Sequence, residues 1–210
     1  MSAGGAGPLS GRLAIVTGGG GGIGGAVCQL LAEKGARVVV AGRTLEKVEA
    51  VAAALPETPT VVEMSEDIFD CSVRGNLKGP FLVSRAAARA MLQAGVTDGA
   101  IVNVSSRAAN DAIPRMSVYA ACKAAIVVFT RCMAIELASR GIRCNSVLPG
   151  LTDSPPVLSM DNELRNALCA SIPLGRPATT REIAEVVVFL CSPESSYVVG
   201  AAWVVAGGKQ

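Results

Sequence analysis

The chain has 210 residues, a formal net charge of +2, half of its residues hydrophobic, 23 glycines and 3% aromatic side chains. Its charges are scattered and nearly balanced, so we predict that it binds neither nucleic acid nor a membrane surface. Histidine is absent from the sequence, which excludes imidazole as a metal ligand or general base, and we expect no metal site.

The seven cysteines include no Cys-x-x-Cys pair and are expected to be reduced. The first residues contain no apolar signal core, and no later apolar run is expected to span a bilayer. The length favours one core. We therefore predict a single domain over residues 1–210, with a flexible segment at 1–10, in the cytoplasm; the mitochondrial matrix is the alternative compartment.

The first half of the chain alternates short apolar runs with helical spacing. Strands are predicted at 13–17 and 37–41, and helices at 23–34 and 45–55. From Ser65 a long helical stretch is expected to reach about Gln93, with Gly79-Pro80 as an irregularity.

The second half resumes the alternation. Strands are predicted at 100–104, 143–148 and 202–205, and helices at 117–139 and 181–190. Residues 151–175 are rich in Pro, Ser and Asn, so we expect a loop region with one short helical patch. Strands alternating with helices predict an α/β fold with a Rossmann-like doubly wound parallel sheet.

A glycine cluster, Thr17-Gly-Gly-Gly-Gly-Gly-Ile-Gly24, joins the first predicted strand to the first predicted helix. Gly18 and Gly22, with Ile23 beside them, would let the backbone approach a pyrophosphate, and Gly24 would permit close helix packing. This position favours a dinucleotide site over a flexible polyglycine loop, which is the alternative.

The second predicted strand is followed by Gly42-Arg43. An acidic residue at this point would bind the ribose hydroxyls of NAD, whereas the Arg43 guanidinium would pair with a 2′-phosphate. The sequence therefore favours NADP(H) over NAD(H). A solvated surface arginine is the alternative interpretation.

Tyr119 and Lys123 are four residues apart and share one face of a predicted helix. The Lys123 ammonium would stabilise a Tyr119 phenolate, so that Tyr119 can serve as acid or base. Ser106 follows a predicted strand, and its hydroxyl could hold a substrate oxygen beside the phenol. A tyrosine and a lysine at this spacing are also common on exposed helices.

Five motifs resemble, in order, those of the short-chain dehydrogenase/reductase family. They are Thr17-Gly-x-x-x-Gly-Ile-Gly24, Asn76-Leu-Lys-Gly, Asn103-Val-Ser-Ser106, Tyr119-Ala-Ala-Cys-Lys123 and Arg143-Cys-Asn-Ser-Val-Leu-Pro-Gly150. The resemblance spans nearly the whole chain.

The resemblance implies a role for each matching residue. Ser106 would orient a carbonyl, Tyr119 would donate the proton, and Lys123 would bind the nicotinamide ribose. Asn76 would hold a proton-relay water, and Ser154 would contact the carboxamide of the cofactor.

The relatives that look most similar are 3-oxoacyl-thioester reductases, tetrameric carbonyl reductases, 17β-hydroxysteroid dehydrogenase type 8 and L-xylulose reductase. The resemblance implies a small-molecule carbonyl or alcohol substrate without choosing one. It also implies a homo-oligomer, usually a tetramer, that assembles through the helix after Asn76 and the helix of Tyr119.

The family's third strand, the helix after it and its fourth strand cannot be found between about residues 55 and 64. We therefore expect an internal deletion that removes a strand from the middle of the sheet, where unpaired backbone groups are costly. Residues 58–63 could occupy that position as a short strand. Cys122 and Ala206 are lesser departures, since the family usually has Ser and Asp there.

Three hypotheses follow. The motifs favour an NADPH-dependent reductase of a ketone, whether a 3-oxoacyl, steroid or small carbonyl substrate. The deletion favours a truncated, inactive variant that joins a full-length relative in a hetero-oligomer. A nucleotide-binding sensor without turnover would keep the turn from Gly18 to Gly24 but lack productive geometry at Tyr119.

Overall fold

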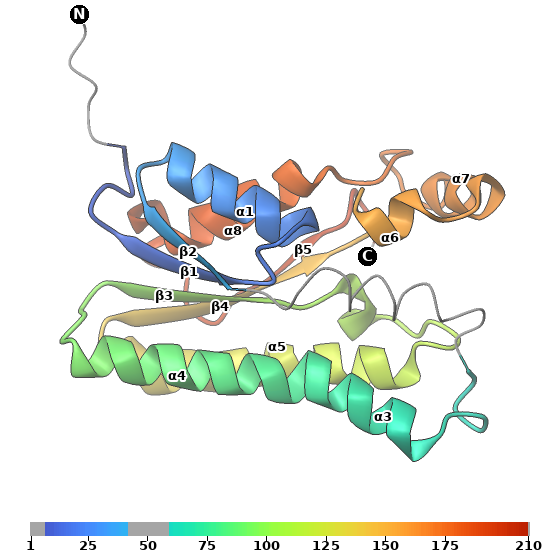
Figure 1. Ribbon diagram of the computed structural model, residues 1–210, viewed down its shortest axis with the longest axis horizontal. Coiled ribbons are helices and arrows are strands. Elements are labelled where there is room, and N and C mark those ends of the chain that lie inside the picture. The colour runs from blue at the N-terminus through green and yellow to red at the C-terminus, as the bar shows by residue number, and fades with distance from the viewer. Residues whose placement is uncertain (1–6, 42–58, 210) are drawn as a thin grey trace, which may run out of the picture.

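Parallel strands and helices alternate along the chain, as the sequence predicts. The computed structural model describes residues 7–41 and 59–209 (Figure 1). The strands are β1 (Leu13–Thr17), β2 (Arg37–Ala41), β3 (Gly99–Val104), β4 (Ile142–Pro149) and β5 (Ala202–Val205). The α-helices are α1 (Gly22–Glu33), α3 (Glu66–Val73), α4 (Gly79–Gln93), α5 (Ser117–Ala138), α6 (Pro155–Leu158), α7 (Asn162–Ala170) and α8 (Thr180–Cys191). A π-helix, η1 (Arg74–Lys78), and two 3-10 helices, η2 (Arg107–Asn110) and η3 (Pro193–Ser195), complete the described elements.

The predicted strands are confirmed, with shifts of one residue at the ends of β3 and β4. The loop predicted over 151–175 is more ordered than expected, because it contains two helices, α6 and α7, instead of one helical patch. The predicted helix at 45–55 lies outside the described residues, as does Arg43.

The irregularity expected at Gly79-Pro80 is a change of helix type. Pro80 has no N–H group and its ring crowds the preceding turn, so the regular α-helical bond to residue 76 cannot form. The chain widens instead into the π-helix η1, and the Gly79 N–H donates to the Arg74 carbonyl five residues earlier. The helical path therefore continues from α3 into α4 without a break (Figure 1).

The strands form two separate parallel groups. β1 pairs with β2 in the register Leu13 to Arg37, and β4 lies between β3 and β5, with Ala100 opposite Arg143. Within the described ranges, no strand joins β1 to β3. The doubly wound sheet of the sequence prediction is thus present as two parts.

Residues 59–63 do not supply the short central strand considered from the sequence. They form a turn in which the backbone N–H and the hydroxyl of Thr60 donate to the Glu63 carboxylate, at 2.9 and 2.7 Å. These bonds, together with Pro59, which lacks an N–H, favour the turn over a strand ladder. Thr58 lies outside the described residues.

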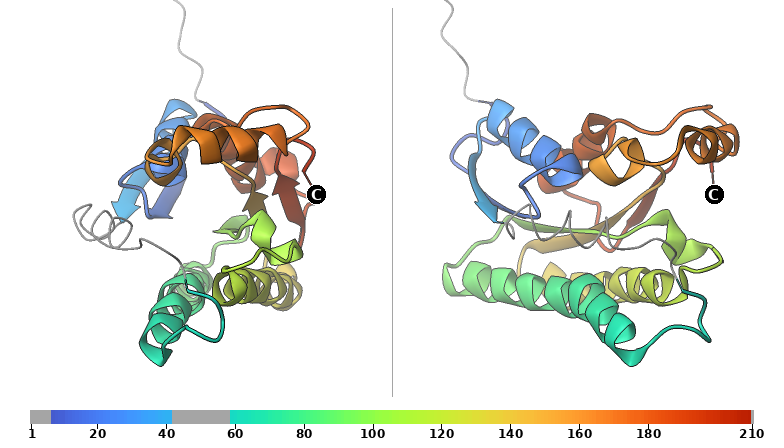
Figure 2. Two further views of the ribbon diagram at one scale, coloured as in Figure 1. Left: turned by 90° about the vertical axis from the view of Figure 1, so that its right-hand side faces the viewer. Right: turned by 45° about the vertical axis from the view of Figure 1, so that its right-hand side comes forward.

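A shared hydrophobic cluster holds the two strand groups together. It lies under α1 and α8, whose helices cover the same face of both groups (Figure 2). The strands contribute Val16 and Val38 from one group and Val102 and Val147 from the other. From the helices come Val27, Leu30, Leu31, Ile183, Ala184, Val187, Val188 and Leu190.

An ion pair forms a second connection between the strand groups, at their amino ends. Arg12 precedes β1, and its guanidinium binds both the carboxylate and the backbone carbonyl of Asp98, which precedes β3. Because both side chains are partly exposed, this pair contributes far less than the buried cluster.

The opposite face of β3 and β4 is covered by α4 and α5, through Ala88, Ile101, Met133, Ile142 and Cys144. Beyond this second cluster, Leu13 and Ile15 of β1 remain 58% and 63% exposed. The helices α4 and α5 therefore cover β3 and β4 on this face, while these two side chains of β1 stay exposed.

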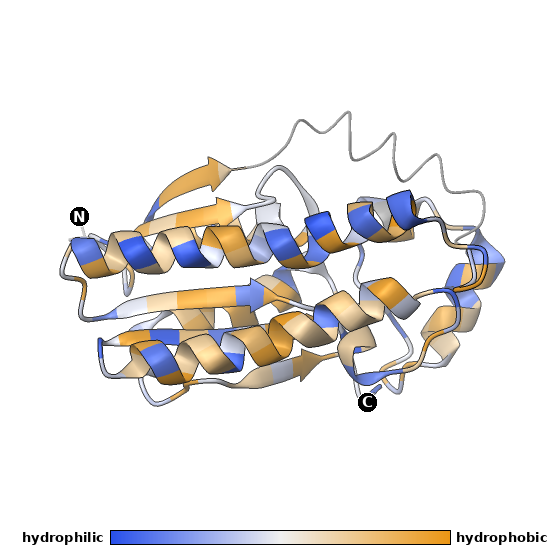
Figure 3. Cartoon of the chain, turned by 90° about the horizontal axis from the view of Figure 1, so that it is seen from below, coloured by the Kyte–Doolittle hydropathy of each residue, from blue (hydrophilic) through white to orange (hydrophobic). Residues whose placement is uncertain are grey.

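The sequence expectation that no apolar run could span a bilayer needs correction. At 22 residues, α5 is long and apolar enough by composition, and Figure 3 shows its mostly hydrophobic colouring. Ile126, Val127 and Met133 of this helix are buried, and it packs along β4. Part of its apolar surface therefore belongs to the protein core, while Val128 and Ile135 are exposed.

The cluster under α1 and α8 predicts a large stability effect for Ile183→Ala. Ile183 is completely buried, and we expect the free energy of unfolding to fall by about 2–5 kcal/mol because the truncation leaves a cavity. Urea denaturation measures this change. Ile135→Ala is the matched control, since Ile135 is 81% exposed and should cost less than about 0.5 kcal/mol. Equal losses in both variants would contradict the role of the cluster.

Candidate active site

The glycine turn begins the site at the carboxyl end of β1. Gly18 and Gly22 both have positive φ angles, of 70° and 54°. A Cβ atom on Gly24 would lie 2.1 Å from the carbonyl oxygen of Gly18, so no side chain fits there. The first turn of α1 thus lies directly against the backbone of the glycine turn.

The first turn of α1 is free to receive an anion. Gly21 is its N-cap and provides no side-chain hydrogen bond, and no acidic residue lies in the first turn. The backbone N–H groups at Gly22 and Ile23 and the positive end of the helix dipole therefore favour a negatively charged group. A pyrophosphate fits this combination of a close backbone turn and uncapped N–H groups.

Ser154 lies beside the glycine turn although it is more than 100 positions away in sequence. A Cβ atom on Gly22 would be 3.8 Å from the Ser154 Cβ. Parallel strands bring the loops after β1 and β4 to the same edge, which explains this proximity. The structure thus places Ser154 with the predicted cofactor-binding residues Gly18, Gly22 and Gly24.

Tyr119 and Lys123 lie together near the start of α5, as their spacing predicts. The Lys123 Nζ is 5.6 Å from the centroid of the Tyr119 ring and donates to the Val104 carbonyl at 3.3 Å. The Ser105 hydroxyl donates to the Lys123 carbonyl at 2.8 Å. These two bonds attach the beginning of α5 to the carboxyl end of β3.

Burial of the Lys123 side chain lowers its pKa from the ordinary value, because the ammonium loses hydration. The nearby Cys122 thiol acts weakly in the opposite direction. The Lys123 charge is therefore held in a partly desolvated position, where its electrostatic effect on a neighbouring phenol is stronger than in water.

Ser106 and Asn76 occupy elements that pack against α5. Ser106 is the N-cap of η2, and its hydroxyl accepts from the Ala108 N–H at 3.2 Å. Asn76 lies in the π-helix η1, where its side-chain amide donates to the Ser72 carbonyl at 3.1 Å. Among the described residues, neither side chain is hydrogen-bonded to Tyr119. The fold brings η1 and η2 against α5, but it does not join the side chains of Asn76 and Ser106 to Tyr119 by hydrogen bonds.

A buried polar network was not assigned by the sequence reasoning. The Ser84 hydroxyl donates to the Asn103 side-chain oxygen at 3.1 Å, and the Asn103 amide donates to the Thr130 hydroxyl at 3.0 Å. Thr130 in turn donates to the Ile126 carbonyl at 2.7 Å. The network connects α4, β3 and α5. The sequence signal for this network is the asparagine within the apolar run Ile-Val-Asn-Val, because a buried amide needs hydrogen-bond partners.

The loops after β4 and β5 meet at the same edge. A cavity of about 90 Å³ lies there, with apolar walls from Leu151, Ile172, Leu174 and Val205. Ala206, where the sequence comparison expects an aspartate, packs against Gly150; a Cβ atom on Gly150 would lie 2.9 Å from the Ala206 Cα. The small residues therefore allow the ends of β4 and β5 to approach closely.

Two family models match the chain. The model described as enoyl-(acyl carrier protein) reductase matches residues 48–210, and the model described as short chain dehydrogenase matches residues 12–64.

Curated relatives match over most of the chain. The (3R)-3-hydroxyacyl-CoA dehydrogenase of Canis lupus familiaris is 34% identical and aligns with 95% of this chain and 96% of its own. The 3-oxoacyl-(acyl-carrier-protein) reductase of Vibrio cholerae is 32% identical, over 95% and 98%. The (3R)-3-hydroxyacyl-CoA dehydrogenase of Rattus norvegicus is 40% identical over 70% of this chain, and the match spans 57% of the rat protein.

Solved structures match in fold. A short-chain type dehydrogenase/reductase from Mycobacterium marinum has a TM-score of 0.84 at 30% identity, covering 96% of both chains. A protein described as a 2-deoxy-d-gluconate 3-dehydrogenase from Agrobacterium tumefaciens, with bound NADP, has a TM-score of 0.86 at 30% identity, covering 95% and 96%. The α/β fold with parallel strands is thus confirmed.

The alignment with the canine relative extends over 251 positions, more than the 210 residues of this chain. This excess is compatible with missing residues in the chain, and the internal deletion between about 55 and 64 stays a prediction.

The polar network predicts that Asn103→Ala destabilises the protein. The variant leaves the Ser84 and Thr130 hydroxyls without their shared partner, and we expect a loss of about 1–3 kcal/mol in the free energy of unfolding. Urea denaturation checks this value against Asn166→Ala, which removes an exposed amide on α7. An unchanged Asn103→Ala midpoint would show that the network is dispensable.

Proposed function

Because the chain belongs to the short-chain dehydrogenase/reductase family, we propose that it is a nicotinamide-dependent oxidoreductase that reduces a ketone to an alcohol. The observation that carries this proposal is the position of Tyr119 and Lys123. They lie side by side on α5, which is attached to the end of β3. The glycine turn lies at the corresponding end of β1.

The proposed chemistry assigns one role to each group. When bound, a reduced nicotinamide supplies a hydride to the carbonyl carbon. Tyr119 donates its phenolic proton to the carbonyl oxygen as the C–O π bond breaks, and the Ser106 hydroxyl donates a hydrogen bond to that oxygen. Lys123 stabilises the resulting phenolate electrostatically. The ketone thus gains one hydride and one proton.

Asn76 would hold a water through which a proton from solvent returns to Tyr119. The amide nitrogen of Asn76 is already engaged by the Ser72 carbonyl, which leaves the amide oxygen to accept a hydrogen bond from that water. The bond to Ser72 holds the Asn76 side chain in one orientation, so that its amide oxygen stays available to the water.

The glycine turn and α1 support binding of the cofactor pyrophosphate, and Ser154 would contact the carboxamide. We propose NADP(H) in preference to NAD(H), on the sequence position of Arg43 after β2. A guanidinium there would form charge-assisted hydrogen bonds with a 2′-phosphate.

We propose a 3-oxoacyl thioester as the substrate. The names of two relatives support this class, since one is a 3-hydroxyacyl-CoA dehydrogenase and the other a 3-oxoacyl-(acyl-carrier-protein) reductase. The cavity lined by Leu151, Ile172 and Leu174, and also by the ion pair of Arg176 and Glu182, offers a partly apolar surface for hydrocarbon next to the carboxyl edge of the strands.

A second candidate function is partner binding without turnover. It is favoured by the separation of β1 from β3, because among the described residues no strand pairing fixes the glycine turn relative to Tyr119. Val128 and Ile135 are exposed on α5, and such apolar side chains suit assembly with a second copy or a full-length relative. A homo-oligomer would be compatible with either function.

The proposed mechanism predicts that Tyr119→Phe abolishes reduction. We expect kcat for a 3-oxoacyl thioester to fall by at least about 10²-fold because the proton donor is lost, while NADPH binding changes little. Stopped-flow NADPH oxidation and a binding titration measure the two quantities. Tyr197→Phe is the matched control, since Tyr197 is fully exposed. Full turnover by Tyr119→Phe would overturn the assignment.

The close contact in the glycine turn predicts that Gly24→Ala prevents NADPH binding. A methyl group there would force Gly18 to move, whereas a Cβ atom on Gly20 would meet open space. In thermal melts with excess NADPH, the original chain and Gly20→Ala should show raised midpoints and Gly24→Ala should not. If the original chain melts cooperatively without any shift from NADPH, the partner-binding function is favoured.

A further inference from the structure

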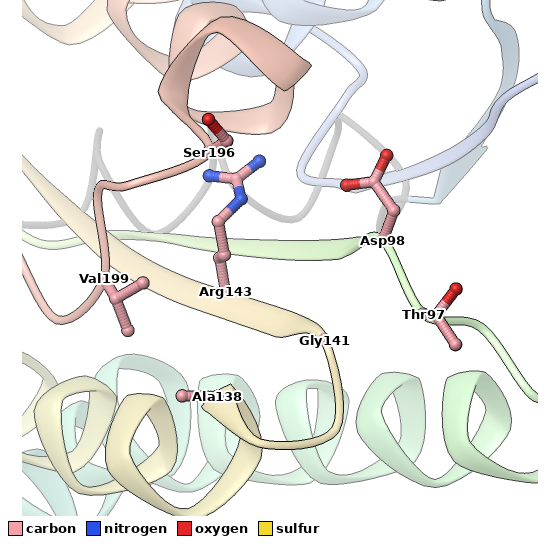
Figure 4. A pocket seen from close by; sticks show the side chains of 7 residues that line it. All are labelled: Thr97, Asp98, Ala138, Gly141, Arg143, Ser196 and Val199. Atoms are coloured by element: carbon pink, nitrogen blue, oxygen red, sulfur yellow. The ribbon is translucent and has the colours of Figure 1, made fainter.

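A larger cavity lies at the amino ends of β3 and β4, the edge opposite to Tyr119 and the glycine turn. Its volume is about 300 Å³, and it is open to solvent on one side. Figure 4 shows Thr97 and Asp98 on the approach to β3, Arg143 on β4, and Ser196 after η3. The cavity is therefore separate from the proposed catalytic machinery.

Gly141 shapes one wall of this cavity. Its φ angle is 74°, and a Cβ atom would lie 2.1 Å from the Thr97 carbonyl oxygen. Its backbone carbonyl accepts from the Gly99 N–H at 2.9 Å, which fixes the start of β3 against β4. The approach of these two segments sets Thr97 in the cavity wall.

Arg143 places a buried positive charge in the cavity wall. The residue is 7% exposed, and its guanidinium donates to the Leu190 carbonyl, the Ser195 hydroxyl and the Ser192 carbonyl at 2.9, 2.8 and 3.0 Å. These acceptors carry no formal charge. In residues 7–41 and 59–209, no carboxylate forms an ion pair with Arg143. A buried charge is normally paired, so this one has capacity for an anion.

The guanidinium also has hydrogen-bonding capacity left. It has five N–H groups, and the three bonds at its terminal nitrogens leave the Nε–H and one terminal N–H without an acceptor in the described part of the chain. Thr97 and Ser196 are exposed to solvent, and their side-chain hydroxyls have no hydrogen-bond partner among the residues described. The cavity thus presents several donors.

Asp98 is the acidic side chain in the wall, and its charge is already compensated. The Arg12 guanidinium binds its carboxylate and also donates to its backbone carbonyl at 3.2 Å. Arg143, by contrast, is balanced in part by the carbonyls at the end of α8, which carry about half a negative charge. The net charge of the side chains in the cavity wall and of their ion-pair partners is therefore positive.

We propose that this cavity binds a small oxyanion, such as a phosphate or carboxylate group, through Arg143, Thr97 and Ser196. A guanidinium with free N–H groups forms charge-assisted hydrogen bonds with both kinds of group. The ligand site lies at the far edge of the strands from Tyr119 and is independent of the proposed reductase function.

Titration of the whole chain with inorganic phosphate or acetate, against potassium chloride at matched ionic strength, tests this site. The readouts are calorimetry and the NMR resonance of the Arg143 Nε–H. We expect saturable binding of at least one oxyanion and a shift of that resonance. Chloride should produce neither. Absence of saturable binding by both oxyanions would overturn the proposal.

Two variants test the location without removing Arg143, which also binds the end of α8. Ser196→Ala and Thr97→Val each remove one hydroxyl donor, and each should weaken binding of the oxyanion about tenfold. Ser10→Ala removes an exposed hydroxyl elsewhere and should bind as the original chain does. Tyr119→Phe should also bind normally, which separates this site from the reductase proposal. Unchanged affinity in both Ser196→Ala and Thr97→Val would place the anion elsewhere and reject the site.

Discussion

The packing of α1 against α8 is the interaction on which the geometry of the site depends. The glycine turn follows β1, and the helix α5 that carries Tyr119 is attached to the end of β3, but these strands belong to different groups. A backbone ladder fixes the register of two strands, whereas apolar side-chain packing is non-directional. Val102 and Val147 join the same cluster as Leu30 and Ile183, so side-chain complementarity sets the distance between the two halves of the site. Small changes in this core are therefore expected to move the glycine turn relative to Tyr119.

Local features of the fold could be predicted from the sequence, but its long-range pairing could not. The apolar runs of β1 and β2 and the spacing of α5 are properties of consecutive residues. The turn at residues 60–63 depends on a side-chain bond between Thr60 and Glu63, which competes with a strand and leaves no signal in hydropathy. Residues 151–175 contain two helices where one short helical patch was predicted, and the start of α7 depends on Asp161, whose carboxylate caps the helix.

In the candidate site too, local features could be predicted from the sequence and long-range contacts could not. The four-residue spacing of Tyr119 and Lys123 was sufficient to predict their proximity, since both lie on one helix. Their attachment to β3 depends on Ser105 and on the Val104 carbonyl, which periodicity does not connect to α5. The role of Asn103 is similar, because its partners come from two helices on either side of it in sequence. Tertiary hydrogen bonds of this kind require the fold to be known first.

Lys123 illustrates why a functional group can oppose stability. Its pKa is lowered in the folded state by burial, so the unfolded chain binds more protons in the interval between the folded and unfolded pKa values. Stability contributed by this group therefore rises as the pH rises through that interval, and the charged form is the less favoured one in the fold. The Val104 carbonyl and the face of Tyr119 offset part of this cost. A neutral apolar side chain would avoid the cost, but it would provide no charge to stabilise a phenolate. Under the proposed function, the partly desolvated ammonium serves proton transfer at Tyr119, at a cost to folding.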